Sequence, residues 1–393
     1  MLSTKQMLPP SPFQVIIKPI GPVCNLQCQY CFYLNKVNLY PKSDSFRMSP
    51  ELLEKHIRLY LNEQPPDYPE VHFLWQGGEP TLMRIDFFQR AVNIQKRYAK
   101  HGIKISNSLQ TNAVLIDEIW AGFLKDENFL VGVSLDGPPE LHDIYRKDKN
   151  GHPTSEKVLR GLKVLQKYEV DVNILTVVNN RNSFHPKNIY EYLKSIGARF
   201  LQFIPLVEVI DGRVSNRSVD SIQFGRFLNR ILDEWIARKD VGKIFVQHFD
   251  LMLGIVMGQP PSLCTHCQTC GNALVLEYNG DIYSCDHFVN ANHKLGNINK
   301  DTYTNLLNSS FQKKFGQKKF DGLPNYCMKC KYLRFCYGGC PKDRILISPE
   351  GEQGLNYLCG GYKVFYSYAS PIFQRMAASI RLGFPGGFQV QNE

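Results

Sequence analysis

The uneven distribution of twelve cysteines over 393 residues is the feature that most limits what this chain can fold into. Three lie close together at Cys24, Cys28 and Cys31, the long stretch that follows contains none, and the other nine fall between Cys264 and Cys359. The N-terminus lacks the apolar run of a secretory signal, so we expect a cytoplasmic protein in a reducing compartment. Clustered cysteines in such a compartment bind metal more often than they form disulfides. We therefore expect two metal-binding regions with different functions.

Composition indicates a folded protein with one large domain or two smaller ones. Hydrophobic residues make up 43% and charged residues 21% of the chain, and no stretch approaches the ~18 consecutive apolar residues of a membrane-spanning helix. The formal net charge of +10 permits nucleic-acid binding, but the basic residues are scattered. Only Lys313–Lys319 forms a short basic run, and we expect a solvated helix face there. We predict neither a nucleic-acid partner nor a membrane partner.

Short apolar, β-branched runs alternate with segments of helical periodicity in the first half of the chain, as in successive β-α units with a parallel sheet. The expected strands are Phe13–Ile20, Val71–Gln76, Lys104–Gln110, Phe129–Leu135, Val172–Val178 and Phe200–Leu206. The expected helices begin after the N-cap Ser49 and at Ile85–Lys100, Ile116–Lys125, Thr154–Tyr168 and Pro186–Ile196. Such a series forms a doubly wound sheet or an incomplete β/α barrel, and both place the active site at the C-terminal ends of the strands.

Polar or glycine-rich residues stand at the ends of five expected strands. They are Cys24, Gln76–Glu79, Gln110–Asn112, Ser134–Gly137 and Gln202. Any one of them is explained by turn chemistry or a helix cap, whereas five in succession indicate a site.

A helix over Ser221–Lys239 is expected to end this region. Beyond it, Ala273–Tyr278 and Asp281–Cys285 predict a hairpin whose Asn279-Gly280 connection suits a type I′ turn. Further helices are expected at Tyr303–Asn308 and after Asn356.

The first cysteine group predicts three thiolates converging from one loop after the first strand. A closed 4Fe-4S cluster takes four cysteines, so three leave one iron open to a small molecule. The alternatives are a zinc site completed by a distant residue, or three unrelated buried thiols.

This Cys-x3-Cys-x2-Cys loop after a first strand resembles the radical S-adenosylmethionine (SAM) superfamily. The resemblance implies an incomplete six-unit β/α barrel whose three-cysteine 4Fe-4S cluster binds SAM at its open iron. It also implies that Tyr30, between the last two cysteines, contacts SAM, and that the Gly77, Gly78 and Glu79 segment binds the SAM amino group.

The later cysteines could form two four-ligand sites, of zinc or of iron-sulfur type, with Cys267 as the spare. Their spacing resembles a SPASM domain, the cysteine-rich extension of many peptide-modifying radical SAM enzymes. The resemblance implies two auxiliary 4Fe-4S clusters with interleaved ligands. Cluster one would take Cys264, Cys270, Cys285 and Cys340, and cluster two would take Cys327, Cys330, Cys336 and Cys359. Three such clusters would add about −5 to the net charge, which further weakens the prediction of nucleic-acid binding.

Most of the chain, from about Phe13 to Tyr368, resembles the anaerobic sulfatase-maturating enzymes. The matching segments are Cys31–Tyr33, Trp75–Leu82, Asn107–Asn112, Leu130–Pro138, Leu201–Ile204, Cys285–Asp286 and Leu355–Tyr357. This resemblance adds Ser134, Arg146 and Leu201 to the expected SAM contacts; a guanidinium at Arg146 can pair with a carboxylate or with ribose oxygens.

The resemblance implies oxidation of a Cys or Ser in an unfolded sulfatase polypeptide to Cα-formylglycine. Cleavage of SAM would give a 5′-deoxyadenosyl radical that removes hydrogen from the substrate Cβ. Asp286 would be the general base for the remaining proton, and an auxiliary cluster would accept the electron. An electron donor such as flavodoxin or ferredoxin would complete the system.

Two other functions remain open. One is another SPASM-type peptide maturase that forms a thioether, crosslink or epimer; because only residues 1–12 precede the first expected strand, no separate peptide-recognition domain is expected there. The other is a non-catalytic iron-sulfur or zinc module. The expected division is a radical SAM partial barrel at 1–239, a SPASM twin-cluster domain at 240–375 and a C-terminal tail at 376–393.

Overall fold

One long, curved sheet organises the molecule in this computed structural model, which describes residues 12–41 and 45–383. Its strand order is β12-β11-β10-β1-β2-β3-β4-β5-β6-β9, and the strands from β1 to β6 pair in parallel with their neighbours in sequence. The strands are β1 Gln14–Lys18, β2 Glu70–Trp75, β3 Lys104–Thr111, β4 Phe129–Ser134, β5 Val172–Val178, β6 Phe200–Pro205, β9 Phe245–Val246, β10 Ala273–Glu277, β11 Asp281–Tyr283 and β12 Lys294–Asn297. Two small hairpins pair β7 Val209–Ile210 with β8 Arg213–Val214 and β13 Leu346–Ile347 with β14 Gln353–Leu355.

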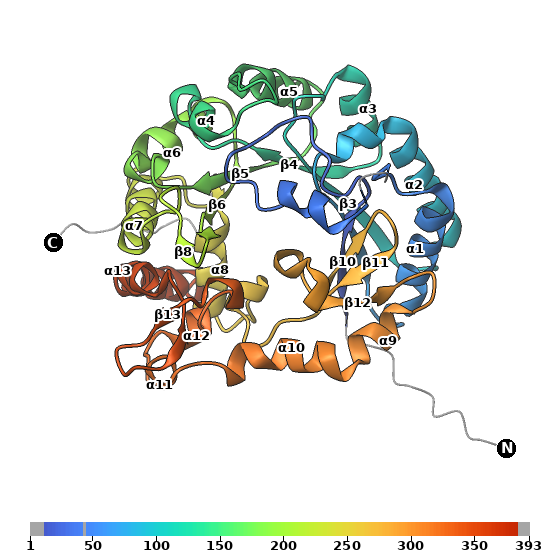
Figure 1. Ribbon diagram of the computed structural model, residues 1–393. Coiled ribbons are helices and arrows are strands. Elements are labelled where there is room, and N and C mark those ends of the chain that lie inside the picture. Colours follow the sequence, from blue (N-terminus) through green and yellow to red (C-terminus); the bar gives the residue numbers. More distant parts are fainter. Residues whose placement is uncertain (1–11, 42–44, 384–393) are drawn as a thin grey trace.

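Helices surround the outside of this sheet (Figure 1). The α-helices of the described residues are α1 Pro50–Glu63, α2 Ile85–Tyr98, α3 Glu118–Asp126, α4 Pro139–Tyr145, α5 Ser155–Lys167, α6 Pro186–Ser195, α7 Ser221–Ala237, α8 Gln247–Val256, α9 Tyr303–Asn308, α10 Ser310–Asp321, α11 Asn325–Met328, α12 Leu333–Cys336 and α13 Cys359–Arg381. Short 3-10 helices are η1 Leu34–Leu39, η2 Pro80–Met83, η3 Asn182–Phe184, η4 Cys264–His266, η5 Asp286–Phe288, η6 Ala291–His293 and η7 Pro341–Asp343. Because the order from β1 to β6 never reverses, the fold is the incomplete barrel and not a doubly wound sheet.

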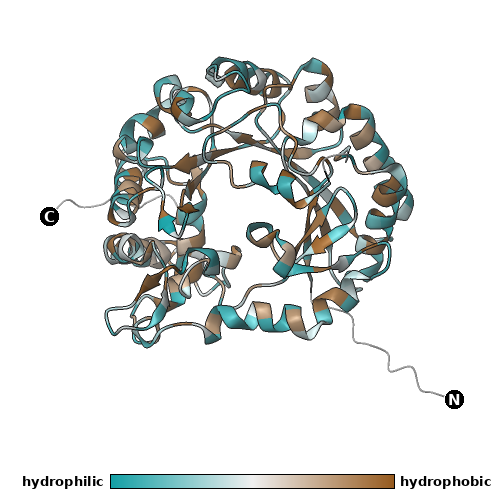
Figure 2. Cartoon of the chain, in the orientation of Figure 1, coloured by the Kyte–Doolittle hydropathy of each residue, from teal (hydrophilic) through white to brown (hydrophobic). Residues whose placement is uncertain are grey.

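The hydrophobic core lies between the sheet and its ring of helices. Figure 2 shows mostly hydrophobic strands and outer helices that mix hydrophobic and hydrophilic residues. Trp75, Phe73 and Phe203 on the strands and Phe88 and Phe227 on the helices are fully buried. Among the described residues, no helix is long and apolar enough to cross a membrane.

The six strands expected from the sequence are all present. Helix α1 begins as its sequence predicts, because Ser49 Oγ accepts a hydrogen bond of 3.2 Å from the backbone N–H of Leu52. The alternation of β-branched strands with amphipathic helices was therefore sufficient to locate these elements.

The hairpin of β10 and β11 is also present, but its predicted turn type is wrong. A type I′ turn needs positive φ at both central residues, and Gly280 has a φ of +89° whereas Asn279 is not among the residues with positive φ. The N–H of Gly280 instead donates to the carbonyl of Glu277 over 2.9 Å. This makes Gly280 the left-handed residue that follows a turn, as in a three-residue hairpin loop.

Strand β10 pairs in parallel with β1, which sequence patterning did not predict. The register runs from Gln14 opposite Ala273 to Lys18 opposite Glu277. The hairpin that leads to Cys285 is therefore part of the barrel sheet. The predicted domain limits at 239 and 375 remain predictions; β9 and β10 continue the sheet beyond the first limit, and α13 spans the second.

The segment from α9 to α13 lies across the gap between the two edges of the sheet, with α13 beside α7 (Figure 1). The two helices approach closely at glycines. A Cβ on Gly361 would lie 1.9 Å from the carbonyl oxygen of Ser221, and a Cβ on Gly225 would lie 2.2 Å from that of Gly361. Because Cys359 begins α13, this contact also fixes the position of that thiol.

We predict that Gly361→Ala destabilises the protein by about 2–3 kcal/mol, because neither backbone can withdraw from the added methyl group. The measurement is denaturant unfolding of the cluster-free protein under reducing conditions. Gly360→Ala is the matched control: its Cβ would meet the mobile Cδ1 of Ile222 at 2.9 Å, and we expect a change below about 1 kcal/mol. Equal stability losses in the two variants would contradict the proposed backbone contact.

Candidate functional site

The loop that follows β1 carries Cys24, Cys28 and Cys31. The Cys24 thiol interacts electrostatically with the other two, so the three lie close together. Burial raises the pKa of Cys24 to about 12 and that of Cys28 to about 11, and the Arg146 guanidinium opposes the shift at Cys28. Deprotonating these thiols therefore requires a compensating positive charge.

The Gln76–Glu79 segment after β2 lies directly on this cysteine loop. Gly78 N–H donates to the Gly21 carbonyl over 2.8 Å, and Glu79 N–H donates to the Val23 carbonyl over 2.9 Å. A Cβ on Gly78 would lie 1.9 Å from the Val23 oxygen. Gly78 is therefore required for the close approach of two backbone segments, one of which enters the Cys24 loop.

The buried carboxylate of Glu79 connects the ends of β2 and β3 through hydrogen bonds. Its Oε1 accepts hydrogen bonds from Thr81 N, Thr81 Oγ1 and Thr111 Oγ1, and its Oε2 accepts one of 2.8 Å from Asn112 N. The side-chain amide of Asn112 in turn lies 3.7 Å from Cys24 Sγ. The Glu79 carboxylate thus holds the strand ends in place around the Cys24 thiol.

A second buried network joins Tyr30 to Asp136 and Arg146. Tyr30 OH donates to Asp136 Oδ2, Arg146 Nε lies 3.1 Å from the same oxygen, and the guanidinium carbon lies 5.5 Å from the centre of the Tyr30 ring. Arg146 Nε therefore forms an ion pair with the Asp136 carboxylate. Ser134 and Leu201, the other expected SAM contacts, are buried on β4 and β6. A buried guanidinium suits an anionic or hydroxyl-bearing ligand.

Asp286 joins residues of the barrel in a cluster of opposite charges. The ammonium of Lys18, at the end of β1, lies 2.7 Å from Asp286 Oδ1 and donates to Gln76 Oε1 over 3.2 Å. It also lies 4.3 Å from the centre of the Tyr33 ring, and Tyr33 OH donates to Glu277 Oε1. Burial raises the pKa of Glu277 to about 7. Lys18 is 1% exposed and Asp286 is 16% exposed, so the pair is buried but reachable.

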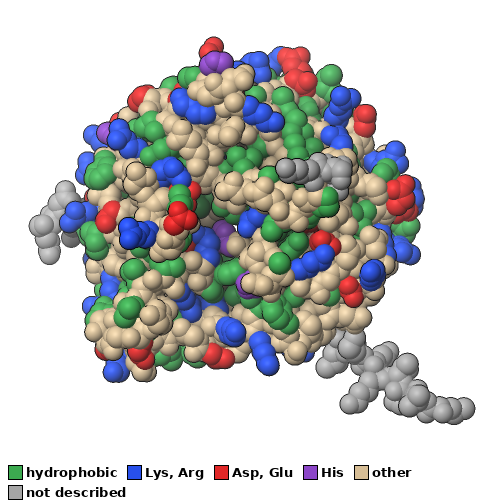
Figure 3. Space-filling model, viewed as in Figure 1, with side chains coloured by type: hydrophobic (Ala, Val, Ile, Leu, Met, Phe, Trp, Pro, Cys, Tyr) green, Lys and Arg blue, Asp and Glu red, His purple; other side chains and the backbone are tan. Residues whose placement is uncertain are grey.

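This cluster lies beside the N-terminal cysteine loop. Cys31 and Tyr33 pack against Val275 and Tyr283 of the β10–β11 hairpin, and Phe32 contacts His287 with ring centres 5.5 Å apart. Figure 3 shows that the molecular surface is hollowed near its middle, with basic, acidic and histidine side chains around the hollow. The arrangement brings a carboxylate of the C-terminal region to the barrel residues that flank the three thiols.

The nine later cysteines fall into two neighbourhoods. Electrostatic interactions link Cys264, Cys270, Cys285 and Cys340, here called group one, and they extend to Cys267, so the assignment of Cys267 as the spare remains a prediction. The Cys267 thiol contacts the carbonyl oxygens of Pro261 and Leu263 at 3.3 Å each.

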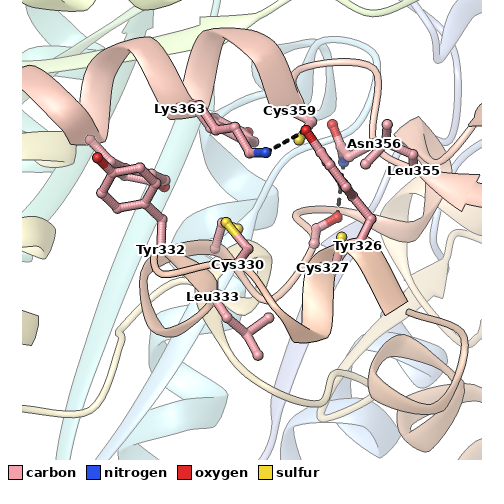
Figure 4. Close-up of a pocket in the computed structure, with 13 residues that line it drawn as sticks. Tyr326, Cys327, Cys330, Tyr332, Leu333, Leu355, Asn356, Cys359 and Lys363 are labelled. Atoms are coloured by element: carbon pink, nitrogen blue, oxygen red, sulfur yellow. Dashed lines mark hydrogen bonds between the residues drawn. The ribbon is translucent and has the colours of Figure 1, made fainter. Parts of the chain in front are cut away.

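Group two consists of Cys327, Cys330, Cys336 and Cys359, which line one cavity (Figure 4). Tyr326 and Lys363 lie at its edge, with Lys363 Nζ 2.5 Å from Tyr326 OH. Burial raises the pKa of Cys327 to about 11 and that of Cys336 to about 12.

The donor sets fit iron-sulfur clusters. Three thiols from one loop, and two further sets of four, are the soft ligands that such clusters take, and a cationic core offsets the cost of ionising buried thiols. No three potential ligands in the described part of the chain converge tightly enough to share a single metal ion.

Comparisons with known proteins agree with this geometry. Residues 19–193 match the radical SAM superfamily, and residues 264–331 match an iron-sulfur cluster-binding domain named SPASM. A serine-type anaerobic sulfatase-maturating enzyme of Bacteroides thetaiotaomicron is 43% identical over 93% of this chain and 91% of its own length. This chain belongs to the anaerobic sulfatase-maturating enzymes.

Both subtypes of this sulfatase-maturating family are among the relatives. A cysteine-type enzyme of Clostridium perfringens is 36% identical over 94% of this chain and 100% of its own length. The solved structure of native anSMEcpe with bound AdoMet and the Cp18Cys peptide aligns with a TM-score of 0.84 at 36% identity, covering 93% of this chain and 99% of that one. The barrel and the cysteine-rich region therefore form one shared architecture.

Sequence reasoning missed Lys18 and Glu277 because both lie inside the expected strands. Each is a charged residue within an apolar run, QVIIKPI and ALVLEY. A charged residue in such a run is a sign of a buried ion pair, because a charge in a buried strand needs a partner.

We predict that Lys18→Met lowers the free energy of unfolding by about 3 kcal/mol, because it leaves Asp286 without its buried cation. The measurement is denaturant unfolding of the cluster-free protein. Lys104→Met, which breaks the exposed pair with Glu70, is the control and should change stability by less than about 1 kcal/mol. The double variant Lys18→Met/Asp286→Asn should lose less than the sum of its single variants, and strict additivity would show that the two charges are not coupled.

Proposed function

We propose that this protein oxidises a Cys or Ser residue in an unfolded sulfatase polypeptide to Cα-formylglycine. The observation that carries the proposal is the meeting of Asp286 with Lys18 and Gln76 beside the loop of Cys24, Cys28 and Cys31. Family membership over nearly the whole chain supports it.

The proposed ligands follow the cysteine groups. Cys24, Cys28 and Cys31 would hold the SAM-binding 4Fe-4S cluster, and groups one and two would hold the two auxiliary clusters. When bound, SAM and its cluster supply the radical that removes a hydrogen atom from the substrate Cβ. Tyr30, Gly77, Gly78, Glu79, Ser134, Arg146 and Leu201 would form or support the SAM site. Arg146 would do so with its buried guanidinium, and Glu79 by holding the loop ends.

One proton and one electron then remain to be removed from the substrate radical. We assign the proton to Asp286, whose carboxylate would accept it from the substrate thiol or hydroxyl. The Lys18 ammonium holds this carboxylate in position at 2.7 Å. A Ser substrate gives the aldehyde directly. A Cys substrate gives a thioaldehyde that water converts to the aldehyde with release of hydrogen sulfide.

The electron would leave toward the auxiliary cysteine groups, the nearer of which includes Cys285, adjacent to Asp286. We further propose that the protein works in the cytoplasm with an electron donor such as flavodoxin or ferredoxin. The direct assay supplies paired peptides that differ only in carrying Cys or Ser at the modified position. Mass spectrometry then reports which one becomes formylglycine; 5′-deoxyadenosine without any peptide product would favour another peptide maturation.

Asp286→Asn should retain production of 5′-deoxyadenosine but lower formylglycine formation by about 10²-fold or more, the usual contribution of a general base. Both products are quantified in one anaerobic reaction by mass spectrometry. Asp321→Asn, on an exposed part of α10, is the control and should match the unaltered protein. Undiminished formylglycine formation by Asp286→Asn would remove the carboxylate from the mechanism.

Cys24→Ala should abolish production of 5′-deoxyadenosine, because two thiolates from the loop are too few to hold the cluster that leaves an iron open to SAM. Cys267→Ala, which removes the spare thiol, is the matched control and should leave production unchanged. Continued SAM cleavage by Cys24→Ala would contradict the assignment of this loop.

A further inference from the structure

Two cations, Lys319 and Arg344, lie among the auxiliary cysteines and form no ion pair with a carboxylate of the described residues. Lys319 on α10 is 0% exposed, although the Lys313–Lys319 run predicted a solvated face, and that prediction is wrong for Lys319. Arg344 lies just after η7 and is partly buried. Neither forms an ion pair in the part of the chain that the structure describes; cysteine thiols are the principal negative groups acting on both. A buried charge without a counter-charge is costly and calls for an explanation.

The ammonium of Lys319 donates all its hydrogen bonds to the backbone of residues 264–270, which we call the first auxiliary loop. It donates to the carbonyl oxygens of Cys264 at 2.6 Å, of Thr265 at 3.2 Å, and of Cys267. An ammonium has three protons, so these three acceptors use all of them. The side chain therefore fixes the segment that presents Cys264 while its positive charge stays uncancelled.

Arg344 occupies the turn between the two cysteine groups. Nε donates to the Gly338 carbonyl at 3.1 Å, Nη2 to the Tyr337 carbonyl at 2.8 Å and Nη1 to the Lys319 carbonyl at 2.6 Å. Tyr337, Gly338 and Gly339 all have positive φ, from +40° to +70°. Only Tyr337 is strained by this conformation, because glycine adopts positive φ freely, and the guanidinium helps to hold the turn in place.

This turn connects Cys336 of group two to Cys340 of group one. The Arg344 guanidinium accordingly interacts with thiols of both groups, Cys327 and Cys336 on one side and Cys340 and Cys270 on the other. Lys319 interacts with Cys264, Cys267 and Cys270, all of them in the first auxiliary loop. Lys319 therefore interacts only with thiols near group one, whereas Arg344 interacts with thiols of both groups.

We propose that Lys319 and Arg344 are the resident counter-charges of the auxiliary clusters and position their loops, Lys319 for group one and Arg344 for both groups. A cluster held by four thiolates is an anion, and reduction makes it more negative. A nearby fixed cation in a medium of low dielectric favours the reduced form. Removing the cation should therefore lower the reduction potential of the cluster that it faces. This inference concerns the cysteine-rich region and holds whichever peptide is the substrate.

The test is a potentiometric titration, followed by electron paramagnetic resonance, of reconstituted protein in which Cys24, Cys28 and Cys31 are replaced by Ala. Only the auxiliary signals then remain. Lys319→Met should lower the reduced-to-oxidised ratio of one auxiliary cluster about tenfold at a fixed potential, a shift of about 59 mV for one electron. Arg344→Gln should shift both clusters. Lys318→Met, which removes an exposed charge one residue away, is the matched control and should shift neither.

Hydrogen exchange of the cluster-free protein measures the positioning role separately. Lys319→Met should speed exchange at residues 264–270 and leave residues 336–340 unchanged. Arg344→Lys, which keeps the charge but loses the planar fork, should speed exchange at 336–340 and retain both potentials. If Lys319→Met does not fold, Arg344→Lys still tests whether positioning and charge are separate roles. Unchanged potentials in Arg344→Gln, or equal shifts of both clusters in Lys319→Met, would overturn the proposal.

Discussion

The parallel pairing of β1 with β10 is the constraint on which the candidate site depends. These two strands lie far apart in the sequence, and their register sets Lys18 opposite Glu277. β1 leads into the loop of the first three cysteines, and β10 leads through β11 to Cys285 and Asp286. One ladder of backbone hydrogen bonds thereby fixes the distance between the residues proposed to hold SAM and the carboxylate proposed to accept a proton. Such a fixed distance is what a reaction of several steps on one substrate carbon requires.

Buried cations recur wherever the chain gathers negative groups. Arg146 lies against Asp136 and the first cysteine loop, Lys18 lies against Asp286, and Lys319 and Arg344 lie among the auxiliary thiols. Each is held by hydrogen bonds or by an ion pair, so its charge has a fixed position. In a protein proposed to carry three anionic clusters, these interior charges offset part of the cost of burying thiolates. Some of the basic residues that make the net charge positive therefore lie inside the molecule and neutralise negative groups there.

The elements that the sequence predicted are those specified by local patterns. β-branched runs, helix caps and the spacing of cysteines act over a few residues, and they located the six barrel strands and the Ser49 cap. The pairing of β1 with β10 could not be predicted in this way, because it depends on contacts between distant segments. Lys319 shows a further reason: it lies on one face of α10 with Gln312 and Gly316, at intervals of four and three residues. None of these three buried residues has an apolar side chain larger than hydrogen, so hydrophobic periodicity did not mark them as buried.

The barrel and the cysteine-rich region are proposed to act together on a single side chain of a sulfatase peptide. The most direct measurement uses a peptide in which both hydrogens on the Cβ of its Ser or Cys are replaced by deuterium, incubated anaerobically with reconstituted protein, SAM and a strong reductant. We predict that formylglycine and 5′-deoxyadenosine appear in equal amounts and that the deoxyadenosine carries the deuterium. Formylglycine accompanied by unlabelled deoxyadenosine, or labelled deoxyadenosine with the peptide Cβ left unoxidised, would contradict it.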